Sequence, residues 1–278
     1  MLITIASGKG GTGKTTVATN LAASLDRNVK LLDCDVEEPN VHIFLNPELV
    51  EHKKITTMVP EVDMALCNKC GECEEICQFS AITLIGKTVM TFPEMCHSCK
   101  GCVMVCPVGA VKESSRELGE IVTGSYGQID LFFGRLRVGE AMSPPLIEKV
   151  KENIDKESIN IIDAPPGTSC PVIAALKGAD FVLLVTEPTP FGLNDLVLAV
   201  EAVRSMGIDC GIVINRCDTG DGRTKKYAEQ EGIPILMEIP DKREIAEAYS
   251  KGIMMIDAFP DMKEAFRTLY SKIEKLII

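Results

Sequence analysis

The sequence predicts an α/β protein with a doubly wound, mostly parallel sheet, interrupted by a small inserted α+β domain. Apolar segments alternate with helix-compatible segments from residue 159 to the end of the chain, which is the pattern of βαβ units. A glycine-rich turn joins the first apolar segment to the first helix-compatible one. Eight of the twelve cysteines fall between Cys67 and Cys106, where the composition changes abruptly. We therefore expect a parent domain in two parts, residues 1–59 and 113–278, separated by an inserted domain at 60–112.

The glycine-rich turn reads Gly-Lys-Gly-Gly-Thr-Gly-Lys-Thr-Thr over residues 8–16. It follows the apolar residues 2–6 and opens the helix-compatible residues 15–25, which is the strand–loop–helix context of a phosphate-binding loop. Glycines bring backbone N–H groups close to oxygen anions, and the helix N-terminus favours phosphate. Lys14 should reach the β- and γ-phosphates and the Thr15 hydroxyl should ligate Mg²⁺. The predicted sheet is therefore of the phosphate-loop NTPase type. The residues expected to contact the nucleotide are Gly8, Gly10, Gly11, Thr12, Gly13, Lys14, Thr15 and Thr16.

The composition excludes several classes of function. At 278 residues, 46% hydrophobic and 25% charged, it is that of a water-soluble globular protein with an ample core. A net charge of −11 argues against nonspecific nucleic-acid binding and against docking on anionic lipid, because both need basic surface. No apolar run approaches the roughly 20 residues of a membrane span. The N-terminus enters an apolar strand without a signal-peptide pattern, so we expect a cytoplasmic protein.

Two further predicted strands end in acidic residues. Residues 29–33 lead into Asp33-Cys34-Asp35, and residues 159–163 end at Asp163. Open α/β sheets bind their ligands at the carboxyl ends of parallel strands. Asp163 stands at the Walker B position, where an aspartate holds Mg²⁺ through a water molecule. Alone, Asp33 and Asp35 would fit ordinary strand-end turns equally well, but beside a phosphate loop we expect both near the nucleotide.

The rest of the parent domain alternates in the same way. Strands are expected at 181–185, 211–215 and 234–239, and helices at 193–206, 225–230, 243–249 and 262–278. The last helix is amphipathic with interleaved acidic residues, which favours packing on the sheet over membrane attachment. Apolar pieces between residues 119 and 140, broken by glycines, suggest short strands that return to the parent sheet.

The clustered cysteines form two groups with the same spacing, and each cysteine lies 29 residues from its counterpart, so the segment is an internal duplication. This spacing is the bacterial two-cluster ferredoxin pattern, in which the fourth cysteine of each group ligates the other cluster. One 4Fe–4S cluster is therefore expected on Cys67, Cys70, Cys73 and Cys106. The second is expected on Cys96, Cys99, Cys102 and Cys77.

Two other uses of these thiols remain as alternatives. A structural zinc site typically uses two Cys-x2-Cys pairs separated by a longer loop, so two further thiols in each cysteine group would have no metal to bind. A disulfide framework does not fit a chain that lacks an export signal. Gln78 departs from the ferredoxin pattern, because it stands where proline follows the fourth cysteine. The cysteine itself is kept, so the predicted ligand set is unchanged.

With these motifs, the chain resembles the deviant phosphate-loop ATPases of the MinD/Mrp/ParA group, with an inserted bacterial two-cluster ferredoxin. The resemblance rests on Lys9, an early lysine inside the loop, and covers nearly the whole sequence. It implies that Lys9 reaches the γ-phosphate of a partner subunit when a homodimer closes over ATP, as an arginine finger does. It also implies that Asp35 positions or deprotonates the attacking water, with Asp33 supporting the Mg²⁺ shell.

The same resemblance assigns further positions. Residues 164–168 correspond to the second switch, and the adenine contacts fall on Asn215, Pro240 and Asp241. Cys170 has the offset of a bridging-cluster cysteine in the nitrogenase iron protein, but residues 113–140 hold no second cysteine, so a structural thiol and a transient cluster site both stay open. Residues 137–147 resemble a portion of ferredoxin-bearing members of the group, and no chemistry follows from them.

Three functions fit this combination. In the first, nucleotide hydrolysis gates electron transfer from the clusters to a redox partner. In the second, the protein is an ATP-dependent carrier that delivers clusters to an apo-protein partner. In the third, it is a MinD-like positioning ATPase with a redox sensor. Eight fixed thiolates favour redox use, whereas the overall likeness to Mrp favours a carrier. We expect an Mg²⁺-dependent ATPase whose clusters serve electron transfer, as an ATP-gated reductase, or metallocluster biogenesis.

Overall fold

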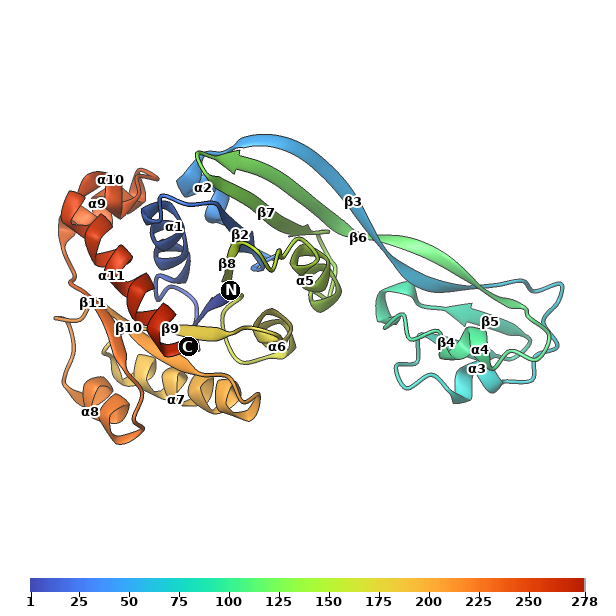
Figure 1. Ribbon diagram of the computed structural model, residues 1–278. Helices are drawn as coiled ribbons and strands as arrows, with labels where there is room; N and C mark the ends of the chain where they lie inside the picture. The colour runs from blue at the N-terminus through green and yellow to red at the C-terminus, as the bar shows by residue number, and fades with distance from the viewer. Residues whose placement is uncertain (278) are drawn as a thin grey trace. The chain divides into compact units, whose positions relative to one another are not determined.

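The computed structural model describes residues 1–277, which form two compact units (Figure 1). Unit 1 comprises Met1–Lys53, Ile121–Arg135 and the chain from Ser143 onward, and unit 2 comprises Lys54–Glu120 and Leu136–Met142. Two long strands, β3 (Glu48–Val62) and β6 (Val111–Tyr126), have residues in both units. The predicted insertion at 60–112 lies within unit 2.

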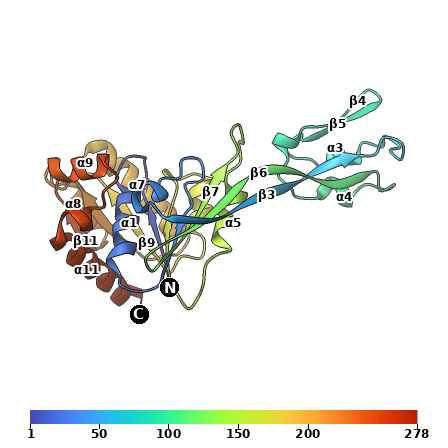
Figure 2. The same ribbon diagram turned by 90° about the horizontal axis from the view of Figure 1, so that it is seen from above.

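Unit 1 is built on a twisted sheet with the strand order β11-β10-β9-β1-β8-β2-β7-β6-β3 (Figures 1 and 2). Its remaining strands are β1 (Leu2–Ala6), β2 (Val29–Asp33), β7 (Ile129–Leu136), β8 (Ile159–Asp163), β9 (Phe181–Thr186), β10 (Cys210–Asn215) and β11 (Ile235–Ile239). All pairings from β11 through β1 to β7 are parallel. The central strands β1, β8 and β9 are mainly apolar and almost wholly buried, as parallel strands covered on both faces must be. The prediction of a doubly wound, mostly parallel sheet is confirmed.

Helices cover both faces of this sheet (Figure 1). On one face α1 (Lys14–Ser24) packs against α11 (Pro260–Ile277) and α10 (Met255–Ala258), with α2 (Val41–Leu45) beside α1. On the other, α5 (Pro144–Lys151) packs against α6 (Cys170–Leu176), and α7 (Pro190–Ser205) packs on β9. The unit is completed by α8 (Arg223–Gln230) and α9 (Arg243–Ser250).

The predicted last helix is α11, which buries Phe266, Leu269, Tyr270 and Ile273 in the core. Residue 278, where that prediction ended, lies outside the described residues. No helix among the described residues is long and apolar enough to cross a membrane.

The stretch between residues 119 and 140 differs from the prediction of several short strands. It forms the end of β6 and the whole of β7, joined by a two-residue turn in which Gly127 takes a φ of 57°. Val138 lies beyond β7 and is almost fully exposed. The 15-residue strand β3 was not predicted, because its first seven residues are exposed and carry no apolar alternation.

Unit 2 repeats one small motif twice. The first copy contains α3 (Glu72–Glu75) and β4 (Ile82–Ile85), and the second contains α4 (Gly101–Met104) and the start of β6. β4 pairs with β5 (Thr88–Thr91) as an antiparallel hairpin, and a 3₁₀ turn follows at Pro93–Met95. The two small hydrophobic cores of unit 2 consist of valine, isoleucine and alanine side chains packed with cysteines.

Candidate functional site

The glycine-rich loop connects β1 to α1 in a shape that side chains would obstruct. Gly13, at the helix start, takes a left-handed φ of 96°, and Gly11 takes 77°. A Cβ on Gly13 would lie 2.6 Å from Asn215 Nδ2. That amide donates a hydrogen bond of 2.9 Å to the Thr12 carbonyl, so the end of β10 braces the loop. A Cβ on Gly8 would collide with the Asp195 backbone.

Behind the loop, Thr15 Oγ1 donates a hydrogen bond of 2.6 Å to Asp163 Oδ2. The other carboxyl oxygen, Asp163 Oδ1, is buried and is one of few buried side-chain atoms in the described chain without a hydrogen-bond partner. Burial raises the pKa of Asp163 to about 7, although Thr15 and Lys14 act against the rise. Burial also lowers the pKa of Lys14, against the attraction of the nearby aspartates. An unpartnered buried carboxyl oxygen beside a threonine hydroxyl fits the hard-oxygen donor set of Mg²⁺.

The two aspartates after β2 have different surroundings. Asp33 is fully buried and accepts N–H bonds from Asp35 at 3.0 Å on one oxygen, and from Asn40 at 2.9 Å and Val41 at 3.0 Å on the other. It therefore organises the loop from Cys34 to Asn40. Any support of the Mg²⁺ shell by Asp33 stays a prediction, and it would act through this loop.

Asp35 faces the cleft in front of the loop. Burial raises its pKa to about 6, and the nearby Lys14 ammonium opposes that rise. A carboxyl group with a pKa close to neutrality can accept a proton from water near physiological pH. Cys34, between the two aspartates, is buried, and its burial raises the thiol pKa far above its ordinary value.

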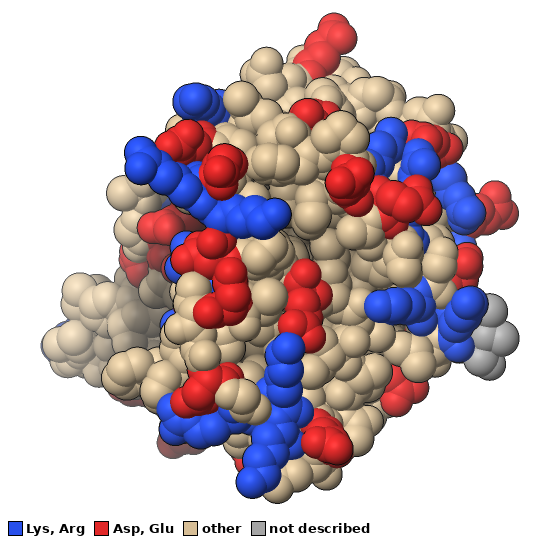
Figure 3. All heavy atoms as spheres, turned by 90° about the vertical axis from the view of Figure 1, so that its left-hand side faces the viewer, with Lys and Arg blue, Asp and Glu red and all other residues tan. Residues whose placement is uncertain are grey.

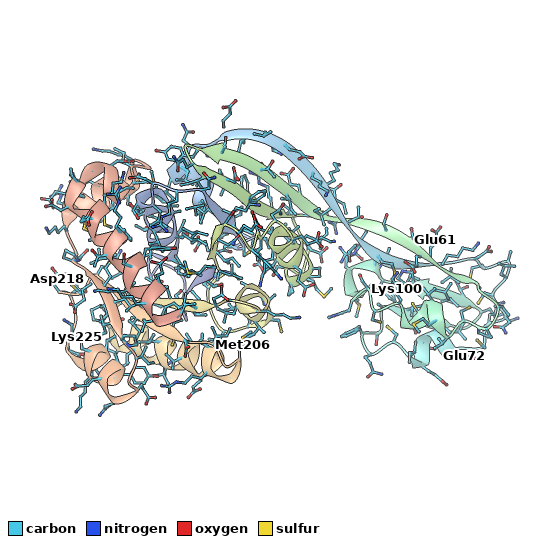
Figure 4. The ribbon with its side chains drawn as sticks, viewed as in Figure 1. Glu61, Glu72, Lys100, Met206, Asp218 and Lys225 are labelled. Atoms are coloured by element: carbon cyan, nitrogen blue, oxygen red, sulfur yellow. The ribbon has the colours of Figure 1, made fainter. Side chains whose placement is uncertain are left out.

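The cleft itself has a volume of about 430 Å³, within the range of small-molecule sites. It brings together most predicted nucleotide contacts from the loop, Asp35, and the predicted adenine residues, and its lining includes Gly10, Gly11, Gly13, Lys14, Thr15, Thr16, Asp35, Asn215, Pro240 and Asp241. Asp218, labelled in Figure 4, orients this end of the cleft, because Asp218 Oδ1 accepts the Asp241 N–H at 2.7 Å.

The lining also includes Pro166, from the predicted second switch, and Arg216, next to Asn215. The lining residues that the sequence did not indicate are Glu38, Asn40, Lys242, Ile245, Ala246, Tyr249 and Met255. Five of them lie on α9 or α10 or just before α9, far from the phosphate loop in sequence. Periodicity indicates that α9 is amphipathic, but only the fold shows which of its side chains meet the cleft.

On the face of the molecule in Figure 3, acidic and basic side chains are interspersed.

Lys9, the early lysine of the loop, has a partner in its own chain. Its Nζ lies 3.5 Å from Glu187 Oε2, and the other oxygen of Glu187 accepts a hydrogen bond of 2.8 Å from Arg216. Arg216 also lines the cleft. The side chain of Lys9 is 32% exposed, whereas that of Glu187 is only 10% exposed. The reach of Lys9 toward a partner subunit stays a prediction.

In unit 2, four cysteines share one cavity. Cys67, Cys70, Cys73 and Cys106 line it together with Val62, Val89 and Val111. Cys106 comes from the second cysteine group, so the fold brings the fourth thiol of one group to the first three of the other. These are the four residues that the spacing predicted for one cluster. Among the described residues, no three metal-binding side chains converge on a single point as one ion requires, and these four thiols instead surround a cavity.

The second predicted set is also gathered in unit 2. Cys77 packs against Cys96 in a small core with Val59 and Ala81. Burial, and the proximity of Cys96 and Cys99, raise the pKa of the Cys102 thiol to about 11. The Ala81 N–H points to Cys77 Sγ at 3.3 Å, and 29 residues on the Ala110 N–H points to Cys106 Sγ at 3.2 Å.

The backbone shows the same duplication as the cysteines. Residues with left-handed φ recur at the 29-residue offset, in the pairs Lys69 and Ser98, Gly71 and Lys100, and Ser80 and Gly109. Non-glycine residues seldom take this conformation, and here they stand at matching places around both cysteine groups. Lys100, labelled in Figure 4, also pairs with Glu113 at 2.7 Å.

The remaining cysteines do not join these sets in the described structure. Cys170 is exposed at the start of α6, and its two possible roles stay open. Cys210 and Cys217 are half-buried, and burial raises the pKa of both thiols.

Comparison with known proteins adds independent findings. The family model of the CobQ/CobB/MinD/ParA nucleotide binding domain matches residues 3–255. An uncharacterized protein of Methanocaldococcus jannaschii is 32% identical over 286 residues, covering 100% of this chain and 98% of its own length. The iron-sulfur cluster carrier protein of Pyrococcus furiosus is 25% identical over 279 residues, covering 91% of this chain and 78% of its own. The fold resembles that of the septum site-determining protein MinD of Pyrococcus horikoshii, solved with Mg-ADP, at a TM-score of 0.60 and 21% identity over 99% of this chain and 96% of that one.

Proposed function

Since the chain belongs to the CobQ/CobB/MinD/ParA family of nucleotide-binding domains, we propose that it binds and hydrolyses ATP with Mg²⁺ and couples this to two 4Fe–4S clusters. In this proposal two subunits close over ATP as a homodimer. The clusters serve one-electron transfer to a redox partner or the biogenesis of metalloclusters. The inserted cysteine-rich segment is a ferredoxin-like domain of its own.

The ATPase half of the proposal rests on the residues around the loop. Lys14 and the loop N–H groups bind the phosphates, while Thr15 and Asp163 hold Mg²⁺, which when bound neutralises charge on the β- and γ-phosphates. Asp35, with its pKa near 6, orients or deprotonates the attacking water. Lys9 leaves Glu187 and supplies positive charge to the γ-phosphate of the partner's nucleotide.

The iron–sulfur half rests on one observation above all: Cys106 shares a cavity with Cys67, Cys70 and Cys73. Crossed ligation between duplicated groups is the arrangement of two-cluster ferredoxins. The residues fit such a cluster because four cysteines, which supply soft sulfur donors, line one cavity together with three valines. A small unit of this kind gains much of its stability from bound metal.

Electron transfer and cluster delivery differ in what happens to the iron. Eight dedicated thiols favour clusters that stay in place and exchange electrons. Relatives named iron-sulfur cluster carrier protein favour delivery, for which exposed Cys170 is a candidate labile site. We favour resident, redox-active clusters and keep the carrier as the second candidate.

The deciding experiment incubates oxygen-protected holoprotein with an apo-ferredoxin, with and without Mg-ATP. Retained iron together with ATP-dependent reoxidation of dithionite-reduced protein would support electron transfer. ATP-stimulated appearance of clusters on the apo-ferredoxin would support the carrier. Purified protein that carries zinc or no metal on the eight thiols, or that fails to bind ATP, would contradict the whole proposal.

A further inference from the structure

Glu140 lies in the stretch to which the sequence assigned no chemistry, and its carboxylate is fully buried. Its side chain is 0% exposed, and it belongs to unit 2 through the segment Leu136–Met142. Glutamates are almost never fully buried unless they are paired, because removing an ionised carboxylate from water is costly. The partners of Glu140 therefore indicate what the stretch is for.

The main partner is Arg116 on β6, whose side chain is 10% exposed. Arg116 Nη2 donates to Glu140 Oε1 at 3.0 Å, and Nη1 donates to Oε2, so the pair is bidentate. The Met142 N–H adds a bond of 3.2 Å to Oε1, and Arg137 Nη2 lies 3.8 Å from Oε2. Burial alone would raise the pKa of Glu140, but these donors hold it below its usual range. The carboxylate is ionised and its charge is matched.

The third donor of Arg116 points to the second cysteine group. Its Nε donates a hydrogen bond of 2.9 Å to the Pro93 carbonyl. The same carbonyl accepts the N–H of Cys96 at 3.2 Å. Arg116 thus holds the 3₁₀ turn that ends at Cys96, and the shared carbonyl places its guanidinium beside the Cys96 backbone.

The first cysteine group has a different and more exposed contact. The Asp63 carbonyl accepts the N–H of Cys67 at 3.1 Å, and the Asp63 carboxylate pairs with Lys112 at 3.2 Å, but these two side chains are 34% and 60% exposed. The 29-residue repeat places Lys87 opposite Arg116 and Met64 opposite Pro93. Lys87 is exposed in the turn between β4 and β5, where bulk water screens its charge. Within the described residues, the two predicted cluster sites are therefore alike in their thiols and unlike in their surroundings.

We propose that the Arg116–Glu140 pair positions the Cys96 turn and sets the reduction potential of the second cluster alone. The inference rests on the proposed iron–sulfur function. Reduction adds negative charge to a cluster, so a nearby cation raises the potential and a nearby anion lowers it. Glu140 offsets the charge of Arg116 and keeps the second cluster at a lower potential than an unpaired guanidinium would.

The test is Glu140→Gln in the full-length holoprotein, which keeps the shape of the side chain and removes its charge. EPR-monitored redox titration should show one cluster with a higher potential and the other unchanged. A tenfold change in the reduced-to-oxidised ratio at a fixed potential corresponds to about 59 mV for a one-electron couple. The cluster that moves should be the one missing in Cys77→Ser protein.

The matched control is Glu117→Gln, one position from Arg116. Glu117 pairs with Lys54 at 3.1 Å, but both side chains are exposed, at 47% and 77%. The same loss of charge should leave both potentials unchanged, since solvent screens it. The complementary variant Arg116→Gln leaves Glu140 buried without its main partner. Its iron content should fall from about eight to about four atoms per chain, with loss of the second cluster only.

Selective loss of the second cluster in Glu140→Gln, with full iron in Glu117→Gln, would also support the positioning role. Full iron with two unchanged potentials in Glu140→Gln would overturn the proposal, and so would loss of both clusters together. A wild-type protein without 4Fe–4S signals would instead contradict the proposed function. The two failures are thus distinct.

Discussion

Thr15 Oγ1 and Asp163 Oδ2 lie 2.6 Å apart, so the first turn of α1 is hydrogen-bonded to the end of β8 across 148 positions of sequence. The contact joins the residue expected to ligate Mg²⁺ to the residue expected to hold its water. It leaves Asp163 Oδ1 buried without a partner. A buried acceptor therefore stays without a partner next to Thr15, which lines the cleft, and the ligand-free protein carries the cost of desolvating that oxygen.

Replacing Asp163 by Asn should therefore separate stability from function. The amide removes a buried charge, so we expect the ligand-free protein to melt at the same or a higher temperature. Mg²⁺ should no longer increase affinity for ADP or ATP, because the anionic ligand is gone. Calorimetric titration with and without Mg²⁺ measures this. The exposed Asp130→Asn on β7 serves as control, and an unaltered Mg²⁺ effect in Asp163→Asn would refute the role.

The loop glycines offer a matched pair. Gly13 has a φ of 96° and would push a Cβ against Asn215, whereas a Cβ on Gly10 meets nothing within 4 Å. Gly13→Ala should destabilise the ligand-free protein by about 1–2 kcal/mol, the cost of a left-handed non-glycine residue. Gly10→Ala should leave the melting temperature nearly unchanged. Equal melting temperatures for the two variants would mean that Gly13 carries no backbone constraint.

Lys9 can be tested by complementation between subunits. Lys9→Ala and Asp35→Ala should each bind ATP and fail to hydrolyse it. If Lys9 acts in trans, a 1:1 mixture contains heterodimers with one complete site, and the mixture should recover about a quarter of wild-type turnover. Steady-state ATPase assays on the mixture measure this. A mixture as inactive as its components would place Lys9 in its own subunit's site, and an active Lys9→Ala protein would show that Lys9 takes no part in the reaction.

The crossed ligation makes a prediction for single cysteines. Cys77→Ser should damage mainly the cluster held by Cys96, Cys99 and Cys102, and Cys106→Ser should damage the other. Anaerobic reconstitution with iron counting, followed by EPR, checks this. Cys217→Ser is the control, since Cys217 lies outside both sets and should leave iron unchanged. Loss of both clusters, or of neither, from Cys77→Ser would contradict crossed ligation.

The two halves should also fail independently. Lys14→Ala removes the buried ammonium that we expect to bind the phosphates, and it should abolish turnover. Because Lys14 and the eight thiols belong to different compact units, the variant should remain brown and keep its full iron content. Absorption near 400 nm and iron assays compare it with wild type. Bleaching of the colour would show that the units are not separable.

The sequence by itself determined the doubly wound parallel sheet and most of its elements. Strands such as β2, β8 and β9 are short and mainly apolar, and most of their residues are buried, which is typical of a parallel sheet covered on both faces. The glycine-rich loop could be recognised because its residues are adjacent in sequence. The two cysteine groups could be recognised because their spacing repeats after 29 residues, and the clusters on them stay a prediction. Both are local constraints.

The tertiary structure decided what depends on distant contacts. Only the fold shows that both carboxyl oxygens of Asp33 accept hydrogen bonds from backbone N–H groups of the loop that follows it. Likewise, only the fold shows that Lys9 pairs with Glu187 and that residues of α9 line the cleft. It likewise turned residues 137–142 from an unexplained stretch into the support of a buried arginine. These pairings exist because a buried charge is costly unless an opposite charge or a hydrogen-bond partner lies beside it. The partner can come from a distant part of the chain, so the spacing of residues in the sequence does not predict it.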